Sequence, residues 1–526
     1  MPQVIIAEPF AESGLRVLRE SGIDVVTCVG ENRAFLLNAL RDADGLIVRS
    51  ETRVDRELLE AGKSLCVVGR AGVGVDAIDV DAATQAGIVV VNTPAANTVA
   101  ATEQTFALML SLMRHTPQAY ASVKAGKWER GPFIGNELLG KTLGIIGLGR
   151  IGGGVATRAQ AFGMKVIAYD PYIAPSRALA HDVELVPLEE LLARADVVTL
   201  HVPLNEQTTR IMDSARLALM KNDALLINCA RGGVVDEEAL LAALEAGHLR
   251  AAAIDVVANE PPTPGSSGAR LQAHARVIAT PHLGGSTHEA LARIATELAT
   301  DLVNVLRGRP ADGAVNAPTP HGADAEKLRP YVDLAYRLGI LHPQLEEGAP
   351  LNPLVMSLRG EIAELDSAPL VSAFLSGLLQ RTTSCRVSVV NAAAIAQERG
   401  LSVEVRSRAA RDSFAASLAI TAGAHTVVGT ALHHGLRIVE IDGYETDAMP
   451  SGSMILTRHQ DVPGIIGRTG TVLGDAGVNI STMQVARSAQ GGEAMMILCV
   501  DRPPDPQTLK SLAQIPALLS VRSITI

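Results

Sequence analysis

The stretch that decides the fold is Thr142-Leu-Gly-Ile-Ile-Gly-Leu-Gly-Arg-Ile-Gly152, followed shortly by Lys165-Val-Ile-Ala-Tyr-Asp170. Its first residues form an apolar run that predicts a buried parallel strand, and an amphipathic segment over 155–162 predicts the next helix. The second run predicts another strand, which ends in a carboxylate. Strand, G-x-G-x-x-G turn, helix, strand and acid follow one another in the order of a dinucleotide-binding unit.

Each glycine of this turn has a physical role in such a unit. Gly147 allows the tight turn, Gly149 lets a pyrophosphate approach the backbone, and Gly152 lets helix and strand pack closely. The N–H groups at the start of the helix then face the phosphates. Asp170 would accept hydrogen bonds from the adenosine ribose, and neither of the next two residues is an Arg that could hold a 2′-phosphate. The sequence therefore predicts NAD as the cofactor; the alternative is a glycine-rich turn in some other α/β protein.

Composition limits the remaining possibilities. The chain has 526 residues, which is enough for three or four domains of roughly 100–200 residues each. The net charge of −10 argues against a nucleic-acid surface, but a small anionic substrate needs only a local group of arginines. No segment is typical of a signal peptide or a membrane span. We expect a cytoplasmic protein that binds neither nucleic acid nor membrane.

The cysteines are odd in number, scattered and without the spacing of metal ligands. They predict free thiols in a reducing compartment and no metal site. These residues are Cys28, Cys66, Cys229, Cys385 and Cys499.

Residues 1–98 alternate short apolar runs with helical segments, which indicates a parallel sheet. Two of these runs end in Arg49-Ser50 and in Arg70. Because ligands of open α/β sheets lie at the carboxyl ends of the strands, the two arginines predict an anion site. Either one alone could be an ordinary surface residue.

A long apolar helix is expected over 99–113, and the βα pattern then continues. Three later strands, expected near 224–230, 252–255 and 276–281, are followed by Arg231, Glu260 and His282. Hydride transfer to NAD requires a group that takes the alcohol proton, and an imidazole suits this role. A carboxylate beside it would favour the imidazolium, and an Arg can grip a substrate carboxylate with two hydrogen bonds. The set predicts a 2-hydroxy acid as substrate, although each residue taken singly could be structural.

With these motifs in place, the chain resembles the D-isomer-specific 2-hydroxyacid dehydrogenases over about residues 1–316. Within that family it resembles the branch that acts on D-3-phosphoglycerate, through Gly69-Arg-Ala-Gly-Val-Gly-Val-Asp76, Asn92-Thr-Pro94 and Gly126-Lys-Trp-Glu-Arg130. The motifs of the wider family are Gly147-Leu-Gly-Arg-Ile-Gly152, Asn228-Cys-Ala-Arg-Gly-Gly233-Val-Val-Asp236, Asp255 through Glu260-Pro-Pro262, and Pro281-His282-Leu-Gly-Gly285-Ser-Thr287.

The resemblance implies NAD-dependent oxidation of D-3-phosphoglycerate to 3-phosphohydroxypyruvate, the first step of L-serine biosynthesis, by a homo-oligomer (dimer or tetramer). It implies a catalytic triad of Arg231, Glu260 and His282. It implies that the substrate contacts Arg49, Ser50, Arg70 and Asn97, and Arg130 across a dimer interface. The expected cofactor contacts are Gly147, Gly149, Arg150, Ile151, Gly152, Asp170, Cys229, Ala230, Arg231, Asp255, His282, Leu283, Gly284 and Gly285.

The sequence departs from the family pattern at a few positions. Val73 and Val202 stand where relatives often have Thr, and Gly153-Gly154 stands where larger residues are usual. Two further glycines in a helix cost roughly 1 kcal/mol each in helix propensity. None of these departures removes a catalytic group.

The pattern changes after residue 317. The segment 317–450 is expected to be an α+β module that is β-rich towards its end. Residues 453–526 predict the order βαββαβ, which is ferredoxin-like, and resemble an ACT regulatory domain. The resemblance implies an amino-acid effector, L-serine, held by Asp461, Asn479 and Ile480. The alternative is that Asp461 caps the helix and Asn479 terminates a turn.

The expected fold is therefore α/β, with two Rossmann-like parallel-sheet domains, an α+β intervening domain and a ferredoxin-like ACT domain. The expected limits are 1–98 for the substrate-binding domain, completed by 288–316, then 99–287 for the NAD-binding domain, 317–450 and 453–526. Two other functions stay open: another D-2-hydroxyacid dehydrogenase, such as a glyoxylate/hydroxypyruvate reductase, or a non-catalytic NAD-sensing protein. Retention of all three catalytic residues argues against the last.

Overall fold

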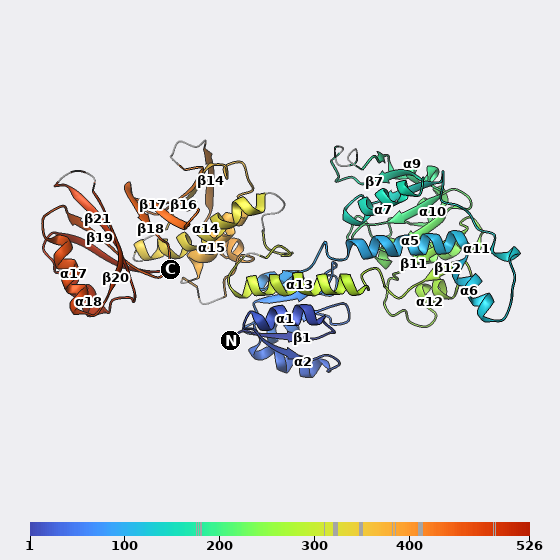
Figure 1. Ribbon diagram of the computed structural model, residues 1–526, viewed down its shortest axis with the longest axis horizontal. Coiled ribbons are helices and arrows are strands. Elements are labelled where there is room, and N and C mark those ends of the chain that lie inside the picture. The colour runs from blue at the N-terminus through green and yellow to red at the C-terminus, as the bar shows by residue number, and fades with distance from the viewer. Residues whose placement is uncertain are drawn as a thin grey trace.

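The computed structural model describes residues 1–174, 176, 178, 181–309, 311–318, 324–346, 351–380, 382–383, 386–408, 414–487, 489 and 491–526. Within these residues the chain forms four β-sheets, which Figure 1 shows spread along the long axis of the molecule. Four of the five cysteines are free thiols, as expected, and Cys385 lies outside the described residues. None of the described helices combines the length and the apolar character of a membrane span.

The first sheet is entirely parallel, with the strand order β2-β1-β3-β4-β5. Every residue of β3 and β5 is buried, which explains their continuous apolar sequence. Its elements are β1 (Gln3–Ile6), α1 (Glu12–Glu20), β2 (Asp24–Thr27), α2 (Arg33–Ala39), η1 (Leu40–Asp42), β3 (Gly45–Val48), α3 (Arg56–Ala61), β4 (Val67–Arg70), α4 (Val80–Gln85) and β5 (Val89–Val91).

The chain returns to this sheet in the long helix α13 (His288–Leu306), which packs against α1 and β4. Leu302 of this helix leaves no room for a side chain at Gly69 of β4, where a Cβ would lie 2.6 Å from Leu302 Cδ1. Farther along, Ala314 pairs with Val91 of β5. The first sheet is thus built from two separate parts of the sequence.

The second sheet is also parallel, with the order β12-β11-β10-β9-β6-β7-β8. Strand order reverses between β6 and β9, and ligands of such sheets bind at this switch point. Its strands are β6 (Thr142–Ile146), β7 (Lys165–Tyr169), β8 (Glu184–Leu185), β9 (Val197–Leu200), β10 (Leu225–Asn228), β11 (Ala251–Ile254) and β12 (Val277–Ala279). Its helices are α5 (Thr98–Arg114), α6 (Thr116–Lys124), η2 (Gly131–Phe133), α7 (Arg150–Ala161), α9 (Leu188–Arg194), α10 (Ser214–Leu219), η3 (Gly232–Val234), α11 (Glu237–Glu245) and α12 (Ser267–Ala273). The two Rossmann-like domains are confirmed.

Helix α7 begins at Arg150, five residues before the start expected from the apolar pattern. The pattern is weak there because glycines occupy the first turns. A Cβ on Gly154 would lie 2.8 Å from Thr102 Oγ1 of α5, so this glycine allows the two helices to pack closely. The departure from the family pattern at this position therefore has a packing reason.

The third sheet is mixed, with the order β14-β13-β15-β16-β17-β18. Strands β13 and β14 are parallel and the other pairs are antiparallel. The expected α+β module is confirmed, although the sequence pattern did not reveal β13, β15 and β18. The elements are α14 (Asp324–Glu346), β13 (Leu354–Gly360), α15 (Ala368–Leu379), α16 (Ala392–Glu398), β14 (Val403–Arg408), β15 (Ala416–Ala422), β16 (His425–Leu432), β17 (Gly435–Ile441) and β18 (Tyr444–Ala448).

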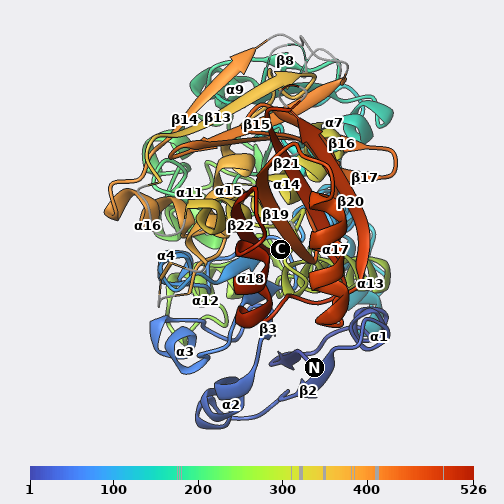
Figure 2. The same ribbon diagram turned by 90° about the vertical axis from the view of Figure 1, so that its left-hand side faces the viewer.

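The fourth sheet is antiparallel, with the order β20-β21-β19-β22, and the chain runs βαββαβ as expected. Figure 2 shows α17 and α18 side by side over one face of it. The other face shares a core with the third sheet, since Leu456 and Ile497 lie in the same apolar cluster as Ile438 and Ile441. The elements are β19 (Ser453–Gln460), α17 (Ile465–Asp475), β20 (Ile480–Arg487), β21 (Glu493–Val500), α18 (Pro506–Ala513) and β22 (Leu518–Thr525). The residue limits of the four domains stay a prediction.

Candidate active site

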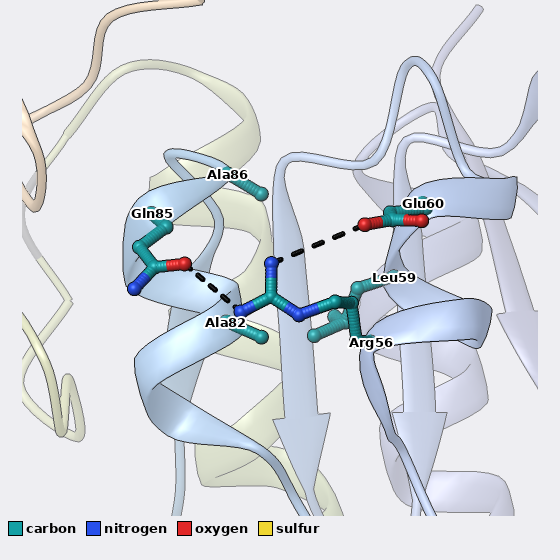
Figure 3. Close-up of a pocket in the computed structure, with 6 residues that line it drawn as sticks. All are labelled: Arg56, Leu59, Glu60, Ala82, Gln85 and Ala86. Carbon is teal, nitrogen blue, oxygen red and sulfur yellow. Dashed lines mark hydrogen bonds and ion pairs between the residues drawn. The ribbon is translucent and has the colours of Figure 1, made fainter.

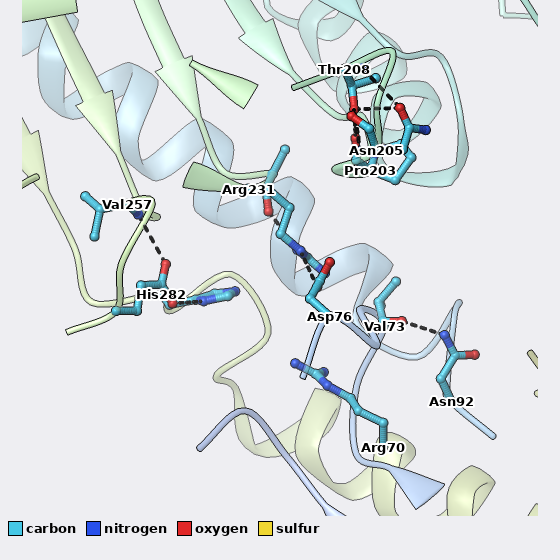
Figure 4. Close-up of polar contacts among 12 residues, drawn as sticks. Arg70, Val73, Asp76, Asn92, Pro203, Asn205, Thr208, Arg231, Val257 and His282 are labelled. Carbon is cyan, nitrogen blue, oxygen red and sulfur yellow. Dashed lines mark hydrogen bonds and ion pairs between the residues drawn. The ribbon is translucent and has the colours of Figure 1, made fainter. Parts of the chain in front are cut away.

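His282 and Glu260 form a hydrogen-bonded pair beyond the carboxyl ends of β12 and β11. His282 Nδ1 lies 2.7 Å from Glu260 Oε2, and both side chains are a little more than one-third exposed. The Val257 N–H donates to the other carboxylate oxygen, Oε1, at 3.2 Å (Figure 4). The pair is thus held in place and still reachable from solvent.

Burial by itself would raise the pKa of Glu260. The hydrogen bond and charge of His282, the Val257 N–H and the charge of Arg231 outweigh it and lower this pKa below its ordinary value. Glu260 is therefore an ionised carboxylate at neutral pH, placed within hydrogen-bond distance of the imidazole.

The turn that presents His282 is organised by Asp255. His282 has a positive φ of 54°, which costs backbone energy in a non-glycine residue. The buried Asp255 carboxylate accepts hydrogen bonds from the Leu283 N–H (2.8 Å), the Gly284 N–H (2.7 Å) and the Thr280 hydroxyl. The observed bonds of Asp255 thus hold the turn that carries His282; its expected cofactor contact stays a prediction.

Arg231 follows β10 and reaches towards the first sheet. Its carbonyl accepts from Asn228 Nδ2 (2.9 Å), and its Nη1 donates to the Ala230 carbonyl (2.7 Å). Its Nε donates to Asp76 Oδ2 at 3.2 Å, across the space between the two parallel sheets (Figure 4). The position of the Arg231 side chain is therefore set by residues of both sheets.

Arg49, Arg70 and Arg231 together form a cationic cluster. Burial lowers the pKa of Arg70 to about 10, and repulsion from Arg231 and Arg49 adds to this; Asp76 and Glu8 act in the opposite direction. Because cations that repel one another gain from a bound anion, this cluster favours an anionic ligand.

Glu8 has a role in this cluster that the sequence did not reveal. Its buried carboxylate accepts the N–H groups of four successive residues after β3, at distances of 2.8, 3.1, 3.2 and 2.9 Å for Arg49, Ser50, Glu51 and Thr52. The available signal was its position just after β1, the neighbour of β3 in the sheet. Glu8 thus shapes the loop that presents Arg49 and Ser50.

The glycine-rich turn has the shape that a dinucleotide requires. Gly147 has a φ of 93°, and a Cβ on Gly152 would lie 2.1 Å from the Gly147 carbonyl oxygen. At Gly149 a Cβ would meet no atom within 4 Å, and no described side chain caps α7, which starts there. This open, uncapped helix start fits a pyrophosphate. Arg150 and Ile151 form its first turn.

Asp170 lies beside this turn, at the end of β7. Its carboxylate accepts the Leu148 N–H at 2.9 Å and the Tyr172 N–H at 3.0 Å. A carboxylate in this place suits ribose hydroxyls and would repel a 2′-phosphate.

The remaining expected residues differ in how closely they join this site. Burial raises the pKa of Cys229 to about 12; the charge of Asp255 adds to this rise and a hydrogen bond from Thr105 opposes it, so the thiol is unreactive.

Asn97 lies at the start of α5, close to Gly285, and its buried Oδ1 has no partner among the described residues. Arg130 is exposed, and no described side-chain contact joins it to the cationic cluster. Its expected role would need a second copy of the chain.

A separate pocket of about 220 Å³ lies between α3 and α4 (Figure 3). None of the expected site residues lines it. Its lining residues are Arg56, Leu59, Glu60, Ala82, Gln85 and Ala86.

In the fourth sheet, Asp461 does not cap the next helix. Helix α17 has Gly464 as its N-cap, without a side-chain hydrogen bond, so the alternative of a capping role is wrong. Asp461 Oδ2 accepts instead from the Gly491 N–H and from Arg487, each at 3.3 Å. The Asn479 N–H donates to Asp501 Oδ1 at 3.1 Å, and its side chain lies at the surface before β20, which begins at Ile480.

His459 lies next to this site, and the sequence analysis predicted no role for it. It is buried, and its Nδ1 has no hydrogen-bond partner among the described residues. Burial lowers its pKa, against the charge of Asp461. A buried nitrogen without a partner is costly unless a ligand or water satisfies it.

Three family models match separate parts of the chain. Residues 106–284 match the D-isomer specific 2-hydroxyacid dehydrogenase NAD binding domain, residues 327–442 the D-3-phosphoglycerate dehydrogenase intervening domain, and residues 453–517 the ACT domain.

Relatives of known name match over the full length. The D-3-phosphoglycerate dehydrogenase of Bacillus subtilis is 41% identical, over 100% of this chain and 99% of its own. That of Methanocaldococcus jannaschii is 42% identical over 100% of both chains.

Solved structures match a little over half of the chain. The TT0316 protein of Thermus thermophilus is similar with a TM-score of 0.55 and 38% identity, over 60% of this chain and 99% of that one. The D-lactate dehydrogenase of Aquifex aeolicus, complexed with NAD and lactic acid, is similar with a TM-score of 0.53 and 29% identity, over 58% of this chain and 96% of that one.

Proposed function

Because this chain belongs to the D-3-phosphoglycerate dehydrogenase family, we propose that it oxidises D-3-phosphoglycerate to 3-phosphohydroxypyruvate with NAD, the first step of L-serine biosynthesis. The observation on which this rests is the His282–Glu260 pair at the same strand edge as Arg231, beside the cationic cluster. A proton-exchanging group and an anion site thus meet at the strand-end edge of the sheet that also carries the dinucleotide turn.

The proton is handled by His282. Because Nδ1 is bound to Glu260, Nε2 is the nitrogen left to accept the proton of the substrate C2 hydroxyl. Ionised Glu260 then stabilises the imidazolium that forms. NAD, when bound, accepts the hydride from C2.

The substrate is held by the arginines. Arg231 can pair its free guanidinium edge with the C1 carboxylate and polarise the C2 oxygen. Arg49 and Arg70 offer positive charge for the phosphate, and the Ser50 hydroxyl and the Asn97 amide N–H groups are further hydrogen-bond donors. Arg130 of a second copy would complete this set. Gly149 and the first turn of α7 would hold the pyrophosphate, and Asp170 the ribose.

We also propose L-serine as an effector bound near Asp461, Asn479 and Ile480. The ACT domain supports this, and so do the buried, unpartnered Nδ1 of His459 and a carboxylate that is not used as a helix cap. Asp461 would hold the ammonium group, and Asn479 the backbone-like groups of the amino acid.

A homo-oligomer, dimer or tetramer, in the cytoplasm fits this function. Several large apolar side chains of the NAD-binding part are exposed, namely Trp128 (79%), Ile134 (80%) and Leu139 (70%). They lie near Arg130 in the sequence. The four described cysteines are unpaired, as expected in a reducing compartment.

The test is steady-state NADH oxidation with 3-phosphohydroxypyruvate, with and without L-serine, for the wild type and for His282→Ala. The control is His433→Ala, which changes an exposed histidine in the turn between β16 and β17. We expect turnover that L-serine suppresses, that His282→Ala abolishes and that the control retains. Activity on hydroxypyruvate or glyoxylate alone would favour a sister reductase. Tight NADH binding without turnover of any 2-oxo acid would favour an NAD-sensing protein.

A further inference from the structure

Asp76 lies between two arginines that come from different sheets. It belongs to the loop after β4 of the first sheet, whereas Arg231 follows β10 of the second. Its Oδ2 accepts from Arg231 Nε at 3.2 Å, and Figure 4 shows it between Arg231 and Arg70. The Asp76 side chain is 55% exposed and that of Arg231 is 26% exposed. The hydrogen bond thus links the two sheets beside the cationic cluster.

The loop that carries Asp76 is shaped to receive Arg231. A Cβ on Gly74 would lie 2.0 Å from Arg231 Nη2 and 2.6 Å from Asp76 Oδ2, so only glycine leaves room for the guanidinium. The loop is held from behind, since Asn92 Nδ2 donates to the Val73 carbonyl and the Thr93 N–H donates to the Gly72 carbonyl at 2.9 Å. A loop with this support can fix the direction of the side chain that it contacts.

The two contacts of Arg231 leave part of its guanidinium free. The Ala230 carbonyl accepts from Nη1 and Asp76 accepts from Nε. A guanidinium has five N–H groups in one plane, so three remain, one on Nη1 and two on Nη2, and the edge between Nη1 and Nη2 can still grip a carboxylate. Fixing the plane at Nε therefore decides where that edge meets a substrate.

The charge of Asp76 also acts on the rest of the cluster. Arg70 is repelled by Arg231 and Arg49, and Asp76 offsets this repulsion more than Glu8 does. With no substrate bound, Asp76 supplies part of the negative charge that an anionic substrate would bring.

We propose that Asp76 is a positioning residue for the oxidation: it orients Arg231 across the space between the two sheets and offsets the repulsion within the cationic cluster. The proposal rests on the proposed function of this site. The orientation of Arg231 affects the reacting complex and therefore kcat. The negative charge of Asp76 weakens the attraction between the cationic cluster and the anionic substrate and therefore affects KM.

Three variants separate these effects: Asp76→Ala, Asp76→Asn and the control Asp81→Asn, an exposed aspartate at the start of α4. Asp76→Ala removes both effects, so we expect kcat to fall roughly 10- to 100-fold, the scale of a misoriented catalytic group, while KM for 3-phosphohydroxypyruvate stays or falls. Asp76→Asn keeps an oxygen for Arg231 Nε but loses the charge. We expect it to retain most of kcat and to show a lower KM, most clearly at low ionic strength.

NADH affinity should be the same in all variants, as should the control's kcat and KM. The proposal is overturned if Asp76→Ala keeps the wild-type kcat. It is equally overturned if both Asp76 variants lose kcat and gain KM together with a lower melting temperature, because that pattern indicates a structural role.

A wild type that does not turn over 3-phosphohydroxypyruvate would contradict the proposed function, and oxalate binding to the NADH complex then decides the role of Asp76. Oxalate is a small dianion that the cationic cluster can bind. Tighter oxalate binding in Asp76→Asn than in Asp81→Asn supports the offsetting charge, and equal binding overturns it.

Discussion

At the scale of single residues, two partly or fully buried carboxylates, Glu260 and Glu8, remain ionised and hold the groups beside them. Glu260 stays ionised because His282, Val257 and Arg231 together outweigh its burial. Glu8 stays ionised for a similar reason: burial would raise its pKa, but the N–H groups of Arg49, Thr52 and Glu51 lower it overall. Each carboxylate therefore acts through the group that it holds, the His282 imidazole in one case and the loop of Arg49 and Ser50 in the other.

Glu260→Gln should slow the reduction of 3-phosphohydroxypyruvate about tenfold or more, within the range of general acid–base contributions. Glutamine can still bond to His282 Nδ1 but does not stabilise the imidazolium. The fall in reduction rate with rising pH should therefore begin at a lower pH than in the wild type. The measurement is the pH profile of kcat, with the exposed Glu206→Gln as control. An unshifted profile in Glu260→Gln would contradict the role given to this residue.

Glu8→Gln should destabilise the protein by about 1–3 kcal/mol at neutral pH, since an amide offers one oxygen to the N–H groups that the carboxylate satisfies with two. The pKa of Glu8 is lowered in the folded protein, so this stabilisation is present above the ordinary glutamate pKa and is lost as the pH falls through the lowered value. The difference between wild type and variant should shrink in acid.

Urea unfolding at neutral and acidic pH measures this difference, with the exposed neighbour Glu51→Gln as the control. Glu8→Gln should also raise KM for 3-phosphohydroxypyruvate without loss of NADH affinity, because the loop of Arg49 and Ser50 becomes less well held. A stability difference that does not change with pH would count against an ionised Glu8.

At the scale of elements, the turn from β6 into α7 contains two glycines with different surroundings. Gly149 has an extended backbone and open space around its missing side chain. Gly152 instead lies against the backbone of Gly147. Two glycines three residues apart in one motif are thus required for different reasons.

Gly149→Val should fold normally but raise the Kd for NADH at least tenfold, about 1.4 kcal/mol, because the side chain fills the approach to the pyrophosphate. Gly152→Val should instead destabilise the fold by about 1–3 kcal/mol, the usual cost of overpacking. Thermal melting and NADH fluorescence titration distinguish the two. Equal losses of stability in both variants would show that the motif acts only through folding.

At the scale of the whole molecule, the third and fourth sheets share one apolar core. Ile497 of β21 lies in that core, whereas its neighbour Met496 faces the cluster under α17 and α18. Arg458 of β19 also binds Asp442, which follows β17, at 2.7 Å. The regulatory and intervening parts are therefore joined by packing and by an ion pair.

Ile497→Ala should loosen both sheets, whereas Met496→Ala should loosen only the fourth. Each cavity should cost about 2–5 kcal/mol in the unit that it affects. Hydrogen exchange measured by peptide should show faster exchange in β17 and β18 for Ile497→Ala alone. Equal exchange of these two strands in both variants would mean that the sheets unfold independently.

Much of the fold could be predicted because its signals are local. Period-2 and continuous apolar runs revealed the βαββαβ order of the fourth sheet and the strands of both parallel sheets, except the two-residue β8. They did not reveal β13 and β18 of the third sheet, whose burial alternates along the strand. They also did not reveal β15, which is almost fully buried, because a short apolar run of this kind cannot be told from a buried helix segment by its period. The start of α7 was misplaced because glycines interrupt its apolar pattern.

The sequence by itself determined the dinucleotide turn, the choice of NAD, and the placement of Arg231, Glu260 and His282 at strand ends, since parallel strands deliver their carboxyl ends to one edge of a sheet. Only the tertiary structure decided the partners of these groups. Asp76 and Arg231 are 155 residues apart, and Glu8 is 41 residues from Arg49. The physical reason is that such pairs arise when sheets and helices pack on one another. The local pattern of apolar and polar residues does not specify which distant residues come within hydrogen-bond distance.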